Sequence, residues 1–417
     1  MTSFFVSTFN CGKLTQDTQY YQHLSAELAG IDAPHVLLFG YQELCSIPDG
    51  CLGYAVDPLN DLIQQVLKAI RDQPWLERYV VVGQHTFGAM GLVAIASADV
   101  LVTDVKLCHV ACGMFWSSLK GAVGLRLNVD GNPVVCVAAH LAANEGFLEQ
   151  RNDDFATIAK EMKFLDPRTG IYDDATVFFL GDLNYRASEN EQGLADYKVV
   201  DELFYAMRSL DAFWDFQEAE IGFKPTYKFH TGTSEYNTKR IPSWCDRVLY
   251  RGAVVPRKYD SIPAVMSSDH KPVYLWASVK LTQSTAVEQG DVPPHILSAA
   301  HVSELLHIRT SIMDYIIALG LLGFTTRMGW ISIAGFLLFA WALYSECIRA
   351  GRYLMRPLGG LGNALTDLRI DSLLRQLSRL LRRELSASAS DEIWNGSAQT
   401  RFVGSAEDYK GLEGEAL

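Results

Sequence analysis

Residues 176–186 read TVFFLGDLNYR, an apolar run that ends in an acid, an amide, a phenol and a guanidinium. A strand entering a turn would explain the Gly, Asp and Asn, because all three adopt turn conformations at little steric cost. Four other stretches also place a metal-binding or proton-handling side chain at the end of an apolar run: STFNCGK (7–13), GYQEL (40–44), VAAHLAA (137–143) and SSDHKPVY (267–274). Sheet proteins commonly assemble their sites at strand ends, so the sequence predicts one shared site.

Together these stretches supply hard oxygen ligands and two histidines, namely Asn10, Glu43, His140, Asp182, Asn184 and His270. Each residue alone is more often a cap, a surface acid or a buried histidine without a catalytic role. As a set they suit Mg²⁺ and a phosphate ester. A phosphate monoester repels hydroxide, so its hydrolysis needs cations on the phosphoryl oxygens and a carboxylate that aligns water.

A local group of cations lies in two further stretches. KPTYKF (224–229) and KRIPSWCDRVLY (239–250) bring four basic residues close in sequence to Asp246: Lys228, Lys239, Arg240 and Arg247. The chain as a whole has a formal net charge of −12, which argues against a general nucleic-acid binder. A polyphosphorylated substrate would need such a local cluster. A solvated surface loop is the alternative interpretation.

Apolar strand-like runs alternate with amphipathic helical stretches from residue 4 to about 279, which is typical of an α/β domain. The predicted strands cover 4–9, 36–41, 91–97, 133–139, 176–181 and 271–279, and the predicted helices cover 17–29, 59–71 and 147–164. The eight cysteines show no CxxC pair and no zinc spacing, so we expect reduced thiols. The first residues lack the features of a signal peptide, which favours folding in the cytosol.

In their order along the chain, the GDLNYR, PSWCDRVL and SDHKPV segments resemble those of the inositol polyphosphate 5-phosphatases, a family of the endonuclease/exonuclease/phosphatase superfamily. The resemblance covers roughly residues 4–279 and is greatest to membrane-anchored fungal members that act on phosphatidylinositol 4,5-bisphosphate. It implies a four-layer α/β/β/α sandwich, in which two central sheets are flanked by helices and the site lies at one end of the sheets. It also implies Mg²⁺ as the cofactor.

The same resemblance implies roles for individual residues. Three of them match the metal shell, namely Asn10, Glu43 and Asp269. The expected catalytic residues are His140 at the scissile phosphate, Asp182 and Asn184 orienting the water and the phosphoryl group, and the acid–imidazole pair Asp246 and His270. The expected substrate-binding residues are Lys120, Tyr227, Lys228, Lys239, Arg240 and Arg247. In the acid–imidazole pair, the carboxylate would hold one tautomer of the ring and favour its charged form.

The chain departs from the family pattern in three places. Gly121-Ala122 follows Lys120 where the family usually has Gly-Gly, and Asn144 replaces a second histidine. The loop between Tyr236 and Arg240 is short, which shifts the expected position of Lys239 relative to a 4-phosphate. Lys228 is therefore the stronger candidate for that contact.

The sequence changes character after residue 280. Residues 281–310 contain a Pro-Pro pair and are expected to be a linker, and residues 311–347 are expected to form a membrane segment. The uncharged run 329–345 approaches the length of about 20 residues that crosses a bilayer. A buried core helix and a hairpin whose first arm is about 312–324 are the alternatives. In the tail, 348–417, a basic amphipathic helix is expected at 365–385, on a membrane or a partner protein, followed by a disordered end.

These patterns lead to one expected function, Mg²⁺-dependent hydrolysis of the 5-phosphate of phosphatidylinositol 4,5-bisphosphate to give phosphatidylinositol 4-phosphate. The expected location is the endoplasmic reticulum membrane, with the catalytic domain facing the cytosol. The expected partners are the phosphoinositide lipid and the membrane, without nucleic acid; the oligomeric state is not predicted. A neutral sphingomyelinase of the same superfamily would leave Lys228 unexplained, because its substrate has no 4-phosphate. A non-catalytic membrane tether would leave the complete set of polar site residues unexplained.

Overall fold

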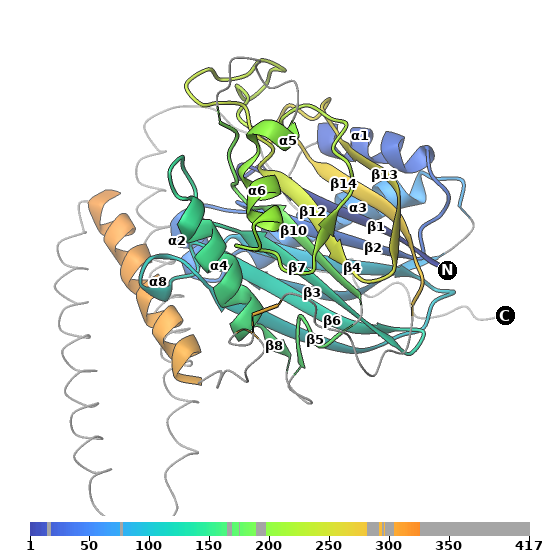
Figure 1. Ribbon diagram of the computed structural model, residues 1–417, viewed down its shortest axis with the longest axis horizontal. Coiled ribbons are helices and arrows are strands. Elements are labelled where there is room, and N and C mark those ends of the chain that lie inside the picture. The colour runs from blue at the N-terminus through green and yellow to red at the C-terminus, as the bar shows by residue number, and fades with distance from the viewer. Residues whose placement is uncertain are drawn as a thin grey trace, which may run out of the picture. The chain divides into compact units, whose positions relative to one another are not determined.

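The computed structural model describes residues 1–14, 18–75, 78–164, 169–174, 176–188, 197–281, 292–293, 296 and 304–325. These residues form two six-stranded sheets with helices on their outer faces (Figure 1). The strand order is β13-β14-β1-β2-β4-β3 in the first sheet and β11-β12-β10-β7-β6-β5 in the second.

The strands of the first sheet are β1 (Thr2–Asn10), β2 (Val36–Gln42), β3 (Tyr79–Phe87), β4 (Met90–Ser97), β13 (Val254–Ser261) and β14 (Val273–Val279). Those of the second are β5 (Val102–Ala111), β6 (Gly121–Val129), β7 (Asn132–His140), β10 (Thr176–Asp182), β11 (Gln217–Glu218) and β12 (Asp246–Arg251). Strands β8 (Lys163–Phe164) and β9 (Thr169–Gly170) form a separate small ladder. The helices are α1 (Thr18–Ala29), α2 (Ile47–Cys51), α3 (Val56–Arg71), η1 (Met114–Trp116), α4 (Leu148–Glu161), α5 (Tyr197–Val200), α6 (Glu202–Arg208) and α8 (Glu304–Thr325).

Three buried apolar layers hold these elements together. The middle layer packs Phe4 and Leu38 of the first sheet against Phe178 of the second. One outer layer joins the first sheet to α1 and α3, and the other joins the second sheet to α4 and α6. Side chains alternate between the faces of a strand, so each central strand contributes to two layers. This arrangement confirms the predicted four-layer α/β/β/α sandwich.

The six predicted strands and three predicted helices are all present, with ends shifted by a few residues. Strands β3, β5, β6, β11, β12 and β13 were not among those predicted. Strands β3, β5 and β13 lie at sheet edges and are partly exposed, so their residues lack a continuous apolar pattern. Strands β6 and β12 are central and buried, but glycines and charged residues interrupt their apolar runs. The cysteines of the described residues are free thiols, as expected; Cys347 lies outside this part of the chain.

Helix α8 begins inside the segment expected to be a linker and contacts α2 and η1. In the described part of the chain, no helix combines the length and the apolar character needed to cross a bilayer. The predicted span at 329–345, the tail at 348–417 and the amphipathic helix at 365–385 lie outside the described residues. Most of the expected linker also lies outside them.

Candidate active site

The site is assembled where four neighbouring strands of the second sheet reach the same level. Gly121 of β6 pairs with His140 of β7, which pairs with Asp182 of β10, which in turn pairs with Asp246 of β12. The three polar residues have the same phase along their strands as the apolar residues that pack between the sheets. Their side chains therefore project into the space between the sheets, toward Asn10 at the end of β1.

Gly181 brings the backbone of β10 close enough to β7 to deliver Asp182. Its φ is +145°, and a Cβ at this position would lie 2.0 Å from the carbonyl oxygen of Ala139. Only glycine fits so near a neighbouring backbone. The Gly-Asp pair within the opening motif is therefore one structural unit, in which the glycine places the acid.

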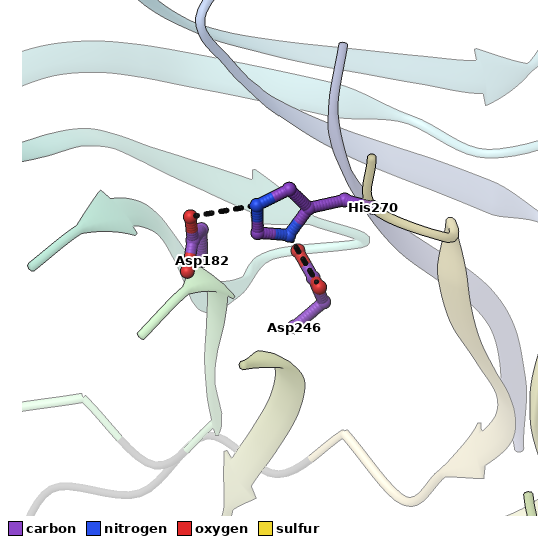
Figure 2. Close-up of side chains that lie close together, drawn as sticks. All are labelled: Asp182, Asp246 and His270. Atoms are coloured by element: carbon purple, nitrogen blue, oxygen red, sulfur yellow. Dashed lines mark hydrogen bonds and ion pairs between the residues drawn. The ribbon is translucent and has the colours of Figure 1, made fainter. Parts of the chain in front are cut away.

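His270 lies between two buried carboxylates, as Figure 2 shows. Its Nδ1 is 2.9 Å from Oδ2 of Asp246, and its Nε2 is 3.7 Å from Oδ2 of Asp182. The hydroxyl of Thr226 donates to the same Asp246 oxygen at 2.7 Å. The structure thus brings together the acid–imidazole pair and the catalytic acid, which come from three distant parts of the sequence.

Asp182 is surrounded by hydrogen-bond donors. The side-chain amide of Asn10 donates to Oδ2 at 3.0 Å, and the backbone N–H of Asn184 donates to Oδ1 at 3.1 Å. Nε2 of His140 lies 3.3 Å from Oδ2. The Asn10 amide also lies 3.4 Å from the Glu43 carboxylate, so it links the acids of the two sheets.

These contacts shift the pKa values of the two histidines in opposite directions. Burial acts to lower the pKa of His270, but the charges of Asp246 and Asp182 outweigh burial and raise the pKa to about 9. Burial, with the nearby Lys120, lowers the pKa of His140. Burial acts to raise the pKa of Asp182, yet His270 and His140 hold it below its usual value. At neutral pH the site therefore holds an imidazolium, a neutral imidazole and a carboxylate.

The family comparison can now be set beside this geometry. A model of the endonuclease/exonuclease/phosphatase family 2 matches residues 7–276. The chain belongs to this family. The matched segment contains every residue placed in the site above, from Asn10 to His270.

Relatives of this family member include three inositol phosphatases. The chain is 38% identical over 170 residues to inositol-1,4,5-trisphosphate 5-phosphatase 1 of Schizosaccharomyces pombe, covering 38% of this chain and 16% of the relative. It is 35% identical over 291 residues to the type II inositol 1,4,5-trisphosphate 5-phosphatase of Mus musculus, a match that covers 65% of this chain and 29% of the relative. It is 32% identical over 263 residues to phosphatidylinositol 4,5-bisphosphate 5-phosphatase A of Homo sapiens, a match that covers 52% of this chain and 26% of the relative. The chain thus matches less than a third of the length of each of these relatives.

Solved structures support the fold of the family. The inositol polyphosphate 5-phosphatase domain of SPsynaptojanin, in complex with inositol (1,4)-bisphosphate and calcium ion, superposes with a TM-score of 0.59 at 22% identity, covering 78% of this chain and 93% of that one. A Cimex nitrophorin ferrous NO complex superposes with a TM-score of 0.53 at 20% identity, covering 67% and 99%. Since proteins with such different names share the fold, function has to be argued from the site.

Asn184 and Arg186 extend the site beyond Asp182. Asn184 has a left-handed φ of +58°, and its side-chain amide donates to the carbonyl of Leu141 at 3.1 Å. Its side-chain oxygen accepts a hydrogen bond from the guanidinium of Arg186. That guanidinium is buried and lies 4.7 Å from the ring centroid of Tyr227. Asn184 therefore fixes Arg186, which was part of the opening motif but had no predicted role.

Three of the predicted substrate-binding residues lie around this centre. Lys120 immediately precedes β6, and its ammonium interacts with the charges of Asp182 and Glu43; burial lowers its pKa to about 8. The Tyr227 ring lies 4.4 Å from that of His270. The Lys228 ammonium is 2.8 Å from the carboxylate of Asp269 and partly exposed. Of these three residues, Lys120 thus supplies a cation at the reacting centre and Lys228 supplies one at its rim.

Asp269 was predicted to belong to the metal shell. Its carboxylate pairs with the Lys228 ammonium at 2.8 Å, and its place in the metal shell stays a prediction. We therefore assign Asp269 to the positioning of Lys228. The two neighbours in the SDHK motif have different partners because Asp269 faces the rim while His270 faces the buried carboxylates.

Two more predicted substrate contacts occupy the loop before β12. Lys239 is exposed. Arg240 forms an ion pair with Glu145 and donates to the Asn144 side chain at 3.0 Å. Asn144 is the residue that replaces the second histidine of the family pattern, and here it holds the loop. Arg240 is thus engaged by protein groups at the surface, and its role in substrate binding stays a prediction.

Arg247 was predicted to bind substrate, and the structure corrects this prediction. Its side chain is fully buried and forms ion pairs with Asp201 at 2.9 Å and with Glu218 at 2.6 Å. The physical reason is the alternation along β12: Asp246 faces the space between the sheets, so Arg247 faces the opposite side. It connects β12 to β11 and to the start of α6 and cannot reach a substrate.

Two hydroxyl groups of the site were missed in the sequence. Thr226 donates to Asp246, as described above. Ser268 donates to the backbone carbonyl of Asn10 at 2.7 Å and accepts from the backbone N–H of His270 at 3.2 Å. Both lie next to residues that were predicted, Tyr227 and Asp269. Ser and Thr are common in loops, so neither hydroxyl gave a signal of its own.

The donor atoms also fit a divalent cation. The imidazolium of His270 already partners the carboxylates of Asp182 and Asp246, so these three do not form the metal site. Among the described residues Glu43 forms no salt bridge, and its carboxylate lies beside the Asn10 amide. A carboxylate and an amide oxygen are ligands of the kind that Mg²⁺ and Ca²⁺ prefer. The Asn10 group beside Glu43 is the amide nitrogen, and the Asn10 oxygen accepts from the backbone N–H of Gly12 at 3.1 Å. Glu43 and the Asn10 oxygen, predicted as metal ligands, are the groups that would hold the ion.

Proposed function

We propose that this chain is a Mg²⁺-dependent phosphatase that removes the 5-phosphate of phosphatidylinositol 4,5-bisphosphate and leaves phosphatidylinositol 4-phosphate. The observation that carries the proposal is the Asp182 carboxylate, buried and kept ionised by Asn10, His140 and His270. A carboxylate placed in this way can align a water molecule for in-line attack on phosphorus. The names of the relatives support the substrate class.

Cations around Asp182 would share the work of stabilising the phosphoryl group. Lys120 and the imidazolium of His270 both act on the Asp182 charge, so both lie near the position of an attacking water. Positive groups fixed at this place stabilise the charge that develops on the phosphoryl oxygens. Lys228, at the rim, is suited to a second phosphate group of the same ring.

The metal ion would be held by Glu43 and Asn10. When bound, Mg²⁺ would offset the negative charge of the phosphate ester. The amide of Asn10 links this site to Asp182, so metal binding and alignment of the water depend on the same side chain.

The test is hydrolysis of a panel of substrates by the full-length chain in detergent, with Mg²⁺ and with a chelator, measured as inorganic phosphate released and, for sphingomyelin, as phosphocholine released. The panel contains phosphatidylinositol 4,5-bisphosphate, phosphatidylinositol 5-phosphate, phosphatidylinositol 4-phosphate, soluble inositol 1,4,5-trisphosphate and sphingomyelin. We expect release only from substrates with a 5-phosphate, and only with Mg²⁺. Release from phosphatidylinositol 4-phosphate at an equal rate, or cleavage of sphingomyelin alone, would refute the proposal.

A further inference from the structure

Helix α8 lies outside the segment that matches the family, yet it packs on the catalytic unit. It follows residue 276, where the match ends, and lies beside α2 (Figure 1). It also contacts η1. The guanidinium of Arg309 lies 3.4 Å from the centroid of the Trp116 ring in η1. The ring of His307 lies 4.9 Å from that of His109 on β5. The helix is thus fixed at several points to the segment between β5 and β6.

Asp314 makes the polar contact at the centre of this interface. It is 6% exposed, and its carboxylate accepts a hydrogen bond from the backbone N–H of Ser118 at 2.8 Å. Ser118 is 2% exposed. A charged acceptor makes a strong hydrogen bond, and a buried N–H without a partner is costly. Ser118 lies two residues before Lys120, the cation next to Asp182.

The segment that carries Ser118 is closed on itself. The backbone N–H groups of Cys112 and Gly113 both donate to the carbonyl of Lys120, at 2.8 and 3.1 Å. Gly113 also donates to the carbonyl of Ser117 at 3.1 Å. A displacement of Ser118 is therefore passed to Lys120 over a short, hydrogen-bonded loop.

A second set of contacts runs from the same loop toward Glu43. A Cβ on Gly88 would lie 2.3 Å from the carbonyl oxygen of Ser118, so the turn between β3 and β4 packs directly on this loop. The next residue, Ala89, accepts a hydrogen bond from the backbone N–H of Leu44 at 2.9 Å. Leu44 follows Glu43. One buried layer beneath α8 thus supports the loops of both Lys120 and Glu43.

We propose that Asp314 of α8 is a positioning residue of the active site, which acts through Ser118 to hold the Lys120 ammonium in place for the phosphoryl group. The inference rests on the proposed phosphatase function. It extends the functional unit beyond the family segment to residue 325. Groups that stabilise developing charge lose their effect when displaced by about 1 Å, so a distant support can change turnover.

The test compares variants of the full-length chain on soluble inositol 1,4,5-trisphosphate, which removes any effect of membrane binding. We expect Asp314→Ala to lower kcat/KM about tenfold to a hundredfold, the range for loss of a hydrogen bond to a charged group, mainly through kcat. Asp314→Asn keeps an oxygen acceptor and should recover activity to within about threefold of wild type. Asp314→Leu, which keeps the branching of the side chain but has no acceptor, replaces Asp314→Ala if that variant does not fold.

Two controls separate positioning from general destabilisation. Ala318→Gly weakens α8 at a buried position without touching Ser118, so it should leave kcat unchanged. Lys120→Ala combined with Asp314→Ala should be no worse than Lys120→Ala alone, because one acts through the other. Additive losses in the double variant, or full activity of both Asp314→Ala and Asp314→Leu, would overturn the inference.

The phosphatase assignment and the role of Asp314 can be tested independently of each other. If the wild-type chain releases no phosphate, the phosphatase assignment fails, and the positioning contact is then read from hydrogen exchange. We expect faster exchange of the amides of residues 113–120 in Asp314→Ala than in Ala318→Gly. Equal exchange in these two variants would show that Asp314 does not order the loop.

Discussion

At the scale of single residues, the site depends on an imidazolium held between two acids. His270 and its partners are buried, so none of the three charges is stabilised by bulk water. Two neighbouring carboxylates repel each other in such a place, and the positive ring compensates both. Removing the ring leaves uncompensated negative charge, which costs several kcal/mol in comparable buried pairs. The charge on His270 is therefore needed to keep Asp182 ionised and also for the fold around it.

Asp182→Asn tests the role of the acid. The amide keeps the shape of the side chain but removes the charge that aligns water, so we expect a loss of at least about two orders of magnitude in kcat. The variant should remain folded by circular dichroism. Activity within about threefold of wild type would contradict the assignment.

Lys228→Ala tests recognition of the second phosphate. A contact away from the reacting centre supplies binding energy only when its phosphate is present. We therefore expect a larger loss of kcat/KM on phosphatidylinositol 4,5-bisphosphate than on phosphatidylinositol 5-phosphate. Lys224→Ala, at an exposed cation of the same stretch, is the control and should lower both equally or not at all. Equal losses for Lys228→Ala would mean that it does not read the 4-phosphate.

At the scale of elements, strand phase explains which site residues the sequence predicts well. His140 and Asp182 end apolar strands in phase with residues of the inner core, so the pattern alone places them between the sheets. Arg247 shows the limit of this reasoning. Its neighbours suggested a substrate contact, whereas one step along β12 turns its side chain to the other face.

Other parts of the site depend on contacts between distant segments, which no local pattern reports. The Arg186 guanidinium lies against the Tyr227 ring, and the backbone N–H of Ser118 donates to Asp314 of α8. Ordinary loop composition hides both relationships. The edge strands β3 and β5 were likewise missed, because their partly exposed residues do not form apolar runs. The central strands β6 and β12 were missed as well, because glycines and charged residues interrupt their apolar runs.

Arg247→Met tests the structural role of the buried ion pairs. Removing the cation leaves Asp201 buried without its partner, so we expect a loss of about 3–5 kcal/mol in the free energy of unfolding. The remaining folded enzyme should keep the same ratio of kcat/KM between substrates with and without a 4-phosphate. Urea denaturation and the two-substrate assay measure these quantities. A selective loss on the 4-phosphate substrate, with unchanged stability, would restore Arg247 to the substrate site.

Asp154 of α4 predicts a pH dependence of stability. Burial raises its pKa from 3.8 to about 6, while its carboxylate accepts from the backbone N–H of Ala142. A raised folded-state pKa means that this group favours folding at low pH and that the advantage is lost as pH rises from about 4 to above 6. Asp154→Asn should therefore be more stable than wild type at pH 7, by about 2–3 kcal/mol at most, and similar to it at pH 4.

The measurement for Asp154→Asn is urea denaturation of both proteins at pH 4, 5, 6 and 7. A stability difference that grows with pH supports the buried acid. A difference that stays constant over this range would show that the carboxyl group titrates in the same way in the folded and unfolded chain.

At the scale of the whole molecule, the contacts of α8 help to decide between a single membrane span and a membrane hairpin. We propose that the chain is anchored in the endoplasmic reticulum through residues 329–345, with the catalytic unit in the cytosol. The hairpin alternative needs a first membrane arm at about 312–324. That segment belongs to α8, whose Asp314 is buried against Ser118 of the catalytic unit. Placing this acid in a bilayer would break the contact and bury an unpaired carboxylate, so the contact favours a single span.

A single span makes a prediction about the carboxy-terminal tail. With the catalytic unit in the cytosol, residues 346–417 would lie in the lumen, although Arg349, Arg352 and Arg356 close to the span would favour the cytosolic side. Asn395-Gly396-Ser397 is an N-glycosylation acceptor that can be used only in the lumen. We expect a glycan on Asn395, lost in Asn395→Gln, and a tag at Leu417 that protease added to intact microsomes does not remove. An unglycosylated Asn395 together with a protease-accessible tag would instead place the tail in the cytosol. That result would overturn the single span and leave a hairpin through residues 312–345, which would break the contact between Asp314 and Ser118, or a segment that does not cross the membrane.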